Sequence, residues 1–317
     1  MPPHLPAAPA DPVCDEDLQL ALYLCYELHY RGFEGVDPEW EWEPSLLRFR
    51  RRLERIFEDA LLDAVGPPGE CPEPEDMDLA LRAVADADDA PSLARFIEIR
   101  ADREHVLEFL VHRSAYQLKE ADPHSFALPR LTGGPKAAAV EIQADEYGGG
   151  RADRMHSALF AKTMRSAGLD DAYGTYLDLV PGITLANVNL MSLLALHRRW
   201  RGAAAGHLAL FEMTSSVPNG RYSRGLGRLG FDEDARDFFD EHVIADAVHE
   251  NIAAVDLAGG LARQDPALGA DALFGARALV HVEAAWSRHI LGAWESGVSS
   301  LRAPLPEPAA TPAGSAP

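Results

Sequence analysis

The sequence has 317 residues, of which 47% are hydrophobic, and this excludes an intrinsically disordered protein. Lys and Arg number 29 against 50 Asp and Glu, so the formal net charge is −21. A field of that sign repels nucleic acid backbones and anionic membrane surfaces, and we expect neither as a partner. The length fits either two domains or one large helical domain with an N-terminal extension.

The cysteines and apolar segments indicate a cellular compartment. All three cysteines lie in the first quarter of the chain without a CxxC motif, which argues against a disulfide framework and against cysteine-ligated zinc or iron–sulfur sites. The N-terminus lacks the basic and apolar regions of a secretory signal. The longest apolar segment, residues 183–196, contains two asparagines and is shorter than the ~20 residues of a membrane span. We therefore expect a cytoplasmic protein.

The first quarter of the chain predicts an N-terminal helical extension. Apolar residues recur at intervals of three and four in residues 17–30 and 45–65, as in amphipathic helices. Residues 66–76 are rich in proline and acids and are predicted to form a linker. We accordingly assign residues 13–76 to the extension and linker, and residues 77–302 to the main domain. The Pro/Ala-rich ends, residues 1–12 and 303–317, are predicted to be disordered tails.

The main domain shows helical patterns throughout. Residues 92–120, 133–147 and 151–167 are predicted helical segments, the last two separated by Gly148–Gly150. No run of alternating strand-forming residues is found, so the predicted class is all-α. Further helix starts are predicted at Asp170, Pro181, Pro218–Gly220, Asp232 and Asp265–Pro266.

The motif HxxxDxxH near the end of the chain carries the main chemical signal. At ~100° per residue, His242, Asp246 and His249 lie within about 60° of one another on one face of a helix. The same face carries apolar residues before and after them, and burying three unpaired ionisable groups there would cost several kcal/mol. A divalent metal removes this objection, because imidazole and carboxylate are ligands of iron, manganese and zinc.

A second group of candidate ligands precedes this motif. Asp153 and His156 have the same carboxylate-x-x-His spacing as Asp246 and His249. Such pairs on two helices, with carboxylates from two others, form di-iron sites in helix bundles. The further carboxylates are Glu120, Glu146 and Glu212. Glu146 precedes His156 by ten residues and would share its face if the helix resumed in register after the glycines.

Each of these signals taken alone has an ordinary structural explanation. His and Asp at helical spacing are often surface partners, and Glu212 on its own could be a buried carboxylate bonded to a backbone donor. Glu120 and Glu146 on their own would most often be solvated charges or caps. The metal hypothesis therefore depends on the combination.

Ordered sequence blocks between residues 94 and 257 resemble a known family, the heme-oxygenase-like di-iron oxidases and oxygenases, also called iron-containing redox enzymes. These blocks are YQLKEADPHSFALPRL, EIQADEYGGG, MHSALF, NLMSLLALHRR, GHLALFEMTSS and EHVIADAVHE. The resemblance implies that the family's ligands fall on Glu120, His156, Glu212, His242, Asp246 and His249. The family's remaining carboxylate varies in position, so Asp153, Glu146 or both would complete the set.

The resemblance also implies a bundle like that of heme oxygenase, with two iron ions in place of heme. The crowd of carboxylates argues against a heme pocket. The implied chemistry is O2 activation through a peroxo-diferric intermediate that oxidises a small organic metabolite. Amine N-oxygenation, hydroxylation and oxidative C–C cleavage all remain open.

Two other functions remain open at this point. The same helical architecture serves cofactor-independent enzymes. A noncatalytic helical protein, with or without metal, would explain the acidic surface, but without metal it would not explain three ionisable residues on one buried face. For the family function we expect a small-molecule substrate, an electron donor where the reaction needs one, and a homodimer. The N-terminal helices lack ligand pairs and are interpreted as packing or dimerisation elements.

Overall fold

Helices form the regular secondary structure of the protein. The computed structural model describes residues 9–305, with the side chains of residues 246–248 excepted, and this part of the chain contains no β-strand. The predicted all-α class is therefore confirmed. Most of the two predicted tails, residues 1–12 and 303–317, lies outside the described residues. Among the described helices, none combines the length and apolar character needed to cross a lipid bilayer.

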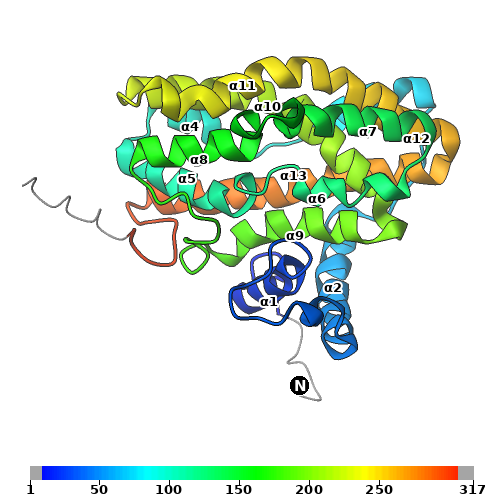
Figure 1. Ribbon diagram of the computed structural model, residues 1–317. Coiled ribbons are helices and arrows are strands. Elements are labelled where there is room, and N and C mark those ends of the chain that lie inside the picture. Colours follow the sequence, from blue (N-terminus) through cyan, green and yellow to red (C-terminus); the bar gives the residue numbers. More distant parts are fainter. Residues whose placement is uncertain (1–8, 306–317) are drawn as a thin grey trace, which may run out of the picture.

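The helices form a bundle around two long elements, α10 and α13 (Figure 1). Helix α10 packs against α11 on one side and against α13 on the other, and α9 lies beneath them in this view. In chain order the α-helices are α1 (Glu16–Glu27), α2 (Pro44–Val65), α3 (Met77–Asp86), α4 (Leu93–Ile99), α5 (Arg103–Gln117), α6 (Asp122–Ser125), α7 (Gly133–Glu146), α8 (His156–Ala167), α9 (Gly182–Leu196), α10 (Arg201–Arg228), α11 (Glu233–Asn251), α12 (Gly259–Gln264) and α13 (Pro266–Glu295).

Shorter elements connect these helices. A π-helix, η7 (Ile252–Ala258), follows α11 directly. The 3-10 turns are η1 (Pro38–Trp42), η2 (Pro74–Asp76), η3 (Leu128–Arg130), η4 (Gly148–Gly150), η5 (Ala152–Arg154) and η6 (Arg198–Trp200).

Several predicted boundaries are wrong for identifiable reasons. The segment 92–120 forms two helices, because Asp102 begins a new one by accepting a hydrogen bond from the His105 backbone. Residues after Asp170 form turns, so no helix starts there. Pro218 lies inside α10, where packing against α11 and α13 outweighs the ~3 kcal/mol that an interior proline costs.

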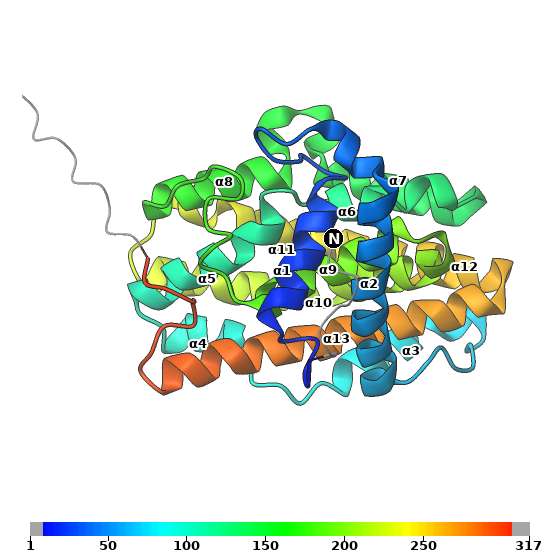
Figure 2. The same ribbon diagram turned by 90° about the horizontal axis from the view of Figure 1, so that it is seen from below.

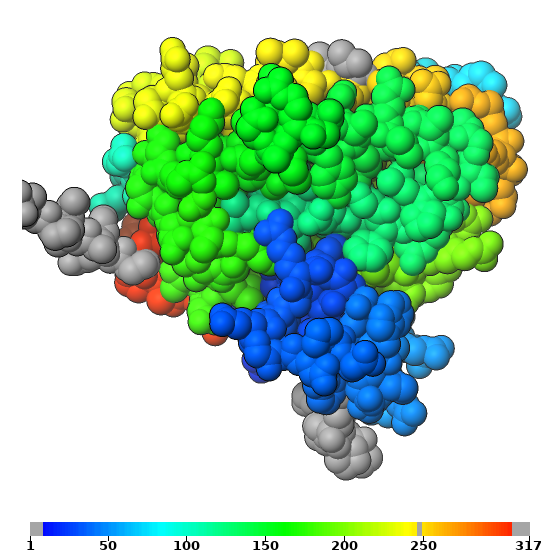
Figure 3. Space-filling view, in the orientation of Figure 1, coloured from blue at the N-terminus to red at the C-terminus, as the bar shows by residue number. Residues whose placement is uncertain are grey.

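The N-terminal helices lie on the α9 side of the bundle (Figure 2). In Figure 3 the N-terminal helices protrude from one side of the molecule. Leu22 of α1 and Phe57 of α2 are fully buried and belong to the same apolar core as residues of α9 and α13. The extension is thus packed into the bundle rather than tethered beside it.

A buried ion pair joins the extension to the turn that follows α5. Lys119 Nζ lies 2.8 Å from Glu27 Oε2, and both side chains are almost fully buried. Tyr173 donates a hydrogen bond to the same carboxylate at 2.6 Å, and the Lys119 ammonium lies 4.2 Å from the centre of the Tyr30 ring. Burial lowers the pKa of Lys119, and the charge of Glu27 opposes that shift.

We expect Glu27→Gln to destabilise the protein by about 3–5 kcal/mol, because it leaves the Lys119 charge buried without a counter-charge. Urea unfolding monitored by circular dichroism measures the loss. Asp89→Asn is the control, because it breaks an exposed pair with Arg288 and should change the stability little. Similar effects of the two substitutions would show that the Glu27–Lys119 pair does not anchor the extension.

Candidate metal centre

Six ionisable side chains from five parts of the chain meet inside the bundle. All are buried, with exposed fractions of 8% or less. They are Glu120 in the turn after α5, Glu146 at the end of α7, His156 at the start of α8, Glu212 in α10, and His242 and His249 in α11.

These side chains form two groups that share one member. In each group, one ligand atom per residue lies within 4.8 Å of all the others. The first group contains Glu120, Glu146, His156 and His242, and the second contains Glu146, Glu212 and His249. Glu146 therefore stands between two potential ion positions.

In the first group the two imidazoles lie close to each other and to two carboxylates. His156 Nδ1 lies 3.1 Å from Glu146 Oε2 and 3.1 Å from His242 Nε2. The other nitrogen of His242, Nδ1, lies 2.7 Å from the Phe238 carbonyl oxygen, which can only accept a hydrogen bond. The proton is thereby placed on Nδ1, and the lone pair of Nε2 faces His156 and the Glu120 carboxylate, 3.6 Å away.

In the second group a carboxylate outside the cluster orients the imidazole. His249 Nε2 lies 3.0 Å from Asp145 Oδ2, while its Nδ1 faces Glu212 Oε2 at 3.3 Å. Burial lowers the pKa of His249, but the two carboxylates outweigh it and raise the pKa to about 9. The carboxylates around His249 therefore favour a positive charge at the position of its ring.

The three carboxylates place a large negative charge in a buried space. Burial raises the pKa of Glu146, but the neighbouring His156 outweighs it and the net shift is downward. For Glu212, burial and the charge of Glu146 raise the pKa. Burial and the neighbouring carboxylate thus oppose ionisation of Glu212, and a metal ion between the carboxylates would offset both effects.

The sequence model of the iron-containing redox enzymes matches residues 107–284, which is more than half of the chain and includes all six side chains. The chain belongs to this family. The predicted resemblance is thus confirmed, together with the heme-oxygenase-like helical fold. No curated protein matches the sequence.

The donor set of this iron-containing redox enzyme fits metal ions. Donor atoms bound at 2.0–2.2 Å to one ion, at angles near 90–110°, lie about 3.0–3.5 Å apart, and several of the observed separations fall in this range. Glu120 Oε2 is buried and has no hydrogen-bond partner among the described residues. Imidazole nitrogen and carboxylate oxygen together suit iron.

The glycine segment explains how Glu146 reaches His156. Helices α7 and α8 follow one another along the same side of the bundle in both views (Figures 1 and 2). The helix does not resume in register, because residues 148–154 form two 3-10 turns and all three glycines have positive φ. A Cβ at Gly148 would lie 2.6 Å from the Arg154 backbone, so this close turn requires glycine.

Two predicted ligands are not among these six. Asp153 lies in the turn η5, largely exposed, and pairs with Arg151 at 3.1 Å, so the structure does not bring it to the cluster. Asp246 lies on α11 between the two histidines, but its side chain falls outside the described part of the structure.

Two residues that the sequence analysis missed contact or face the cluster. Asp145 hydrogen-bonds His249 and is the immediate neighbour of Glu146. Tyr116, one helical turn before Glu120, is buried, and burial together with the nearby carboxylates raises its pKa. Their closeness to Glu146 and Glu120 in the sequence was the only available signal, because neither completes a ligand spacing.

The raised pKa of His249 predicts a pH dependence for the metal-free protein. Because the folded-state pKa of about 9 exceeds the ordinary value of 6.5, protonation stabilises the fold fully below pH 6.5. That contribution is lost as the pH rises through 9. Thermal unfolding of chelator-treated protein should therefore show a midpoint that falls between pH 6.5 and 9, and His249→Asn should flatten this decline. An equally steep decline in the variant would assign it to other groups.

Proposed function

We propose that the protein is a non-heme di-iron oxidase or oxygenase that uses O2 to oxidise a small organic metabolite. The observation that carries the proposal is the sharing of Glu146 between two ligand groups, in a chain that belongs to the iron-containing redox enzymes. One ion would be held by Glu120, His156 and His242, and the other by Glu212 and His249, with Glu146 between them. Asp246 is a further proposed ligand, because it follows His242 by one turn of α11.

The ligand charges suit redox chemistry. Two iron(II) ions would supply two of the four electrons that reduce O2 to water, and the substrate or an electron donor would supply the others. Three carboxylates would offset three of the four positive charges of two iron(II) ions. They would also stabilise the additional positive charge on the ions after oxidation to iron(III). Imidazoles, which are neutral donors, retain the ferrous ions.

The surrounding residues orient the imidazoles and place apolar rings beside them. The Phe238 carbonyl and the Asp145 carboxylate each accept a ring N–H, so the opposite nitrogens face the carboxylates. The Phe238 ring lies 4.3 Å from the His242 ring and 5.0 Å from Phe160, which forms an apolar wall beside the ligands. We further propose a small-molecule substrate, a homodimer and a cytoplasmic location.

The proposal predicts about two iron ions per chain after anaerobic reconstitution with iron(II). Because Glu146 belongs to both groups, Glu146→Gln should reduce binding at both positions, whereas Glu212→Gln should reduce it at one. Elemental analysis of desalted protein measures the content. Glu141→Gln, an exposed position on the same helix, is the matched control and should retain two ions. Two retained ions in Glu146→Gln would refute the shared-ligand arrangement.

The oxidase assignment predicts that the iron(II)-loaded protein consumes O2 at least tenfold faster than the same concentration of free iron(II). An oxygen electrode measures the rate, and the double variant His242→Ala, His249→Ala should fall to the rate of free iron. Tight iron binding without faster O2 uptake, with candidate substrates added, would indicate a noncatalytic metal-binding protein instead.

A further inference from the structure

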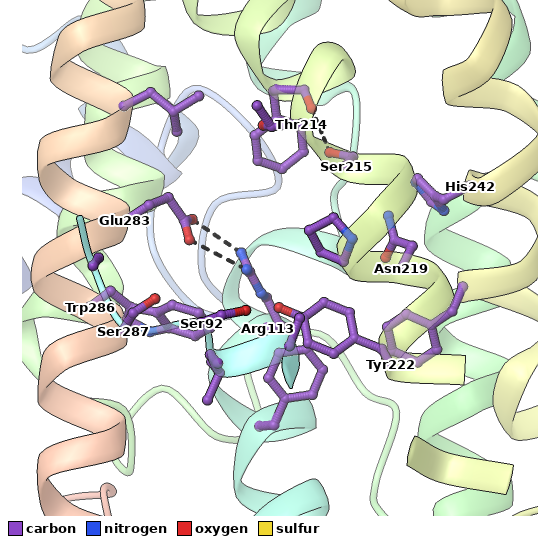
Figure 4. Close-up of a pocket in the computed structure, with 18 of the residues that line it drawn as sticks. Ser92, Arg113, Thr214, Ser215, Asn219, Tyr222, His242, Glu283, Trp286 and Ser287 are labelled. Atoms are coloured by element: carbon purple, nitrogen blue, oxygen red, sulfur yellow. Dashed lines mark hydrogen bonds and ion pairs between the residues drawn. The ribbon is translucent and has the colours of Figure 1, made fainter. Parts of the chain in front are cut away.

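A cavity of about 270 Å³ adjoins the first ligand group (Figure 4). Glu120 and His242 form part of its wall, so a molecule in the cavity would reach the proposed ions. The loop that contains Asp88 and Ser92 also lines it, and this loop is exposed to solvent. The cavity therefore extends from the surface to the candidate metal centre.

An ion pair lies in the wall of this cavity, away from the ligands. Arg113 donates two hydrogen bonds to the Glu283 carboxylate, at 3.2 and 3.4 Å. The guanidinium lies 4.2 Å from the centre of the Trp286 ring, and Figure 4 shows Tyr222 beside it. The pair is buried in part, with side-chain exposures of 18% for Arg113 and 25% for Glu283. No step of the proposed chemistry uses it.

The chemistry of the pair favours a cationic ligand. The Arg113 guanidinium already donates two hydrogen bonds to Glu283, and its planar face stacks on the Trp286 ring. Both its edge and its face are therefore engaged by protein groups. A carboxylate has about four lone-pair positions, and Arg113 occupies two of those on Glu283. Asp88 adds a second acid to the cavity wall, and the ring of Tyr222 attracts cations.

The position of the pair sets the orientation of such a ligand. Arg113 lies within α5, whereas Glu120 lies in the turn after the end of that helix at Gln117, so the two residues line different parts of the cavity. The cavity wall also contains aromatic rings, including Phe160, Phe211 and Phe238, and the Phe238 ring lies 4.3 Å from the His242 ring. A polar group at Glu283 would leave the apolar part of the molecule beside the metal ligands.

We propose that this cavity binds a primary amine whose ammonium group contacts Glu283 and whose apolar chain extends toward Glu120 and His242. Arg113 positions the Glu283 carboxylate. Since the ammonium lies at the end remote from the ligands, the atom presented to the metal centre is a carbon, and N-oxygenation of that amine is disfavoured. The identification of this ligand as the substrate rests on the proposed function, whereas its binding does not.

Three probes of equal chain length, n-hexylamine, hexanoate and 1-hexanol, test the charge preference by calorimetry on metal-free protein. Hexylamine should bind at least tenfold more tightly than the other two. Glu283→Gln should abolish this preference and leave 1-hexanol binding unchanged. Glu295→Gln, an exposed position near the end of the same helix, is the control and should behave as the wild type.

Glu283→Gln leaves Arg113 without a counter-charge, which destabilises the fold. The double variant Arg113→Gln, Glu283→Gln removes both charges, so its ligand binding can be measured without that destabilisation. It too should bind all three probes alike. Preferential binding of hexanoate by the wild type, or retention of the amine preference in both variants, would overturn the proposal.

The orientation is tested with manganese(II) as a paramagnetic ion in the candidate centre. The methyl protons of bound hexylamine should broaden more than the protons next to nitrogen, and an equal or reversed gradient would overturn the orientation. Amine preference without iron-dependent O2 uptake would refute the proposed function alone. Iron binding and O2 uptake without amine preference would refute this inference alone.

Discussion

The structure depends on one electrostatic constraint, which is the cost of holding three carboxylates and three imidazoles inside an apolar bundle. Such groups cannot share a buried space unless positive charge compensates them. The packing around them follows from this requirement. Their backbone positions lie in four helices and one turn, so the bundle must close to assemble the cluster and must retain a compensating charge once it has closed.

Helix α11 shows how one stretch of sequence meets several requirements. Phe238 contributes its carbonyl to fix the proton of His242, while its ring packs against Phe160 and forms part of the cavity wall. Two turns after His242, His249 reaches the second ligand group. Exchanging the Phe238 side chain would therefore alter the cavity and leave the backbone bond in place, which separates the two roles physically.

The sequence predicted the helical class and most helix positions, because amphipathic periods and caps are local properties. It also singled out His242 and His249, whose spacing places them on one face. It did not choose between Glu146 and Asp153, because that choice depends on the path of residues 148–154, where positive φ values break the helical register. The pairing of Arg113 with Glu283 spans 170 positions and leaves no local pattern. Asp145 was missed since hydrogen bonds to ligands follow no fixed spacing.

The ion pair between Glu27 and Lys119 bears on how the domain is delimited. The family match begins at residue 107, yet the residue next to Glu120 has its counter-charge in α1. Arg31 also donates a hydrogen bond to the Leu118 carbonyl of the same turn, at 2.8 Å. The residues matched by the family model are thus fewer than the residues that form the packed structure. A fragment cut at the limits of the match would remove the carboxylate that pairs with Lys119, one residue from a candidate ligand, so the N-terminal segment contributes to the surroundings of the candidate metal centre.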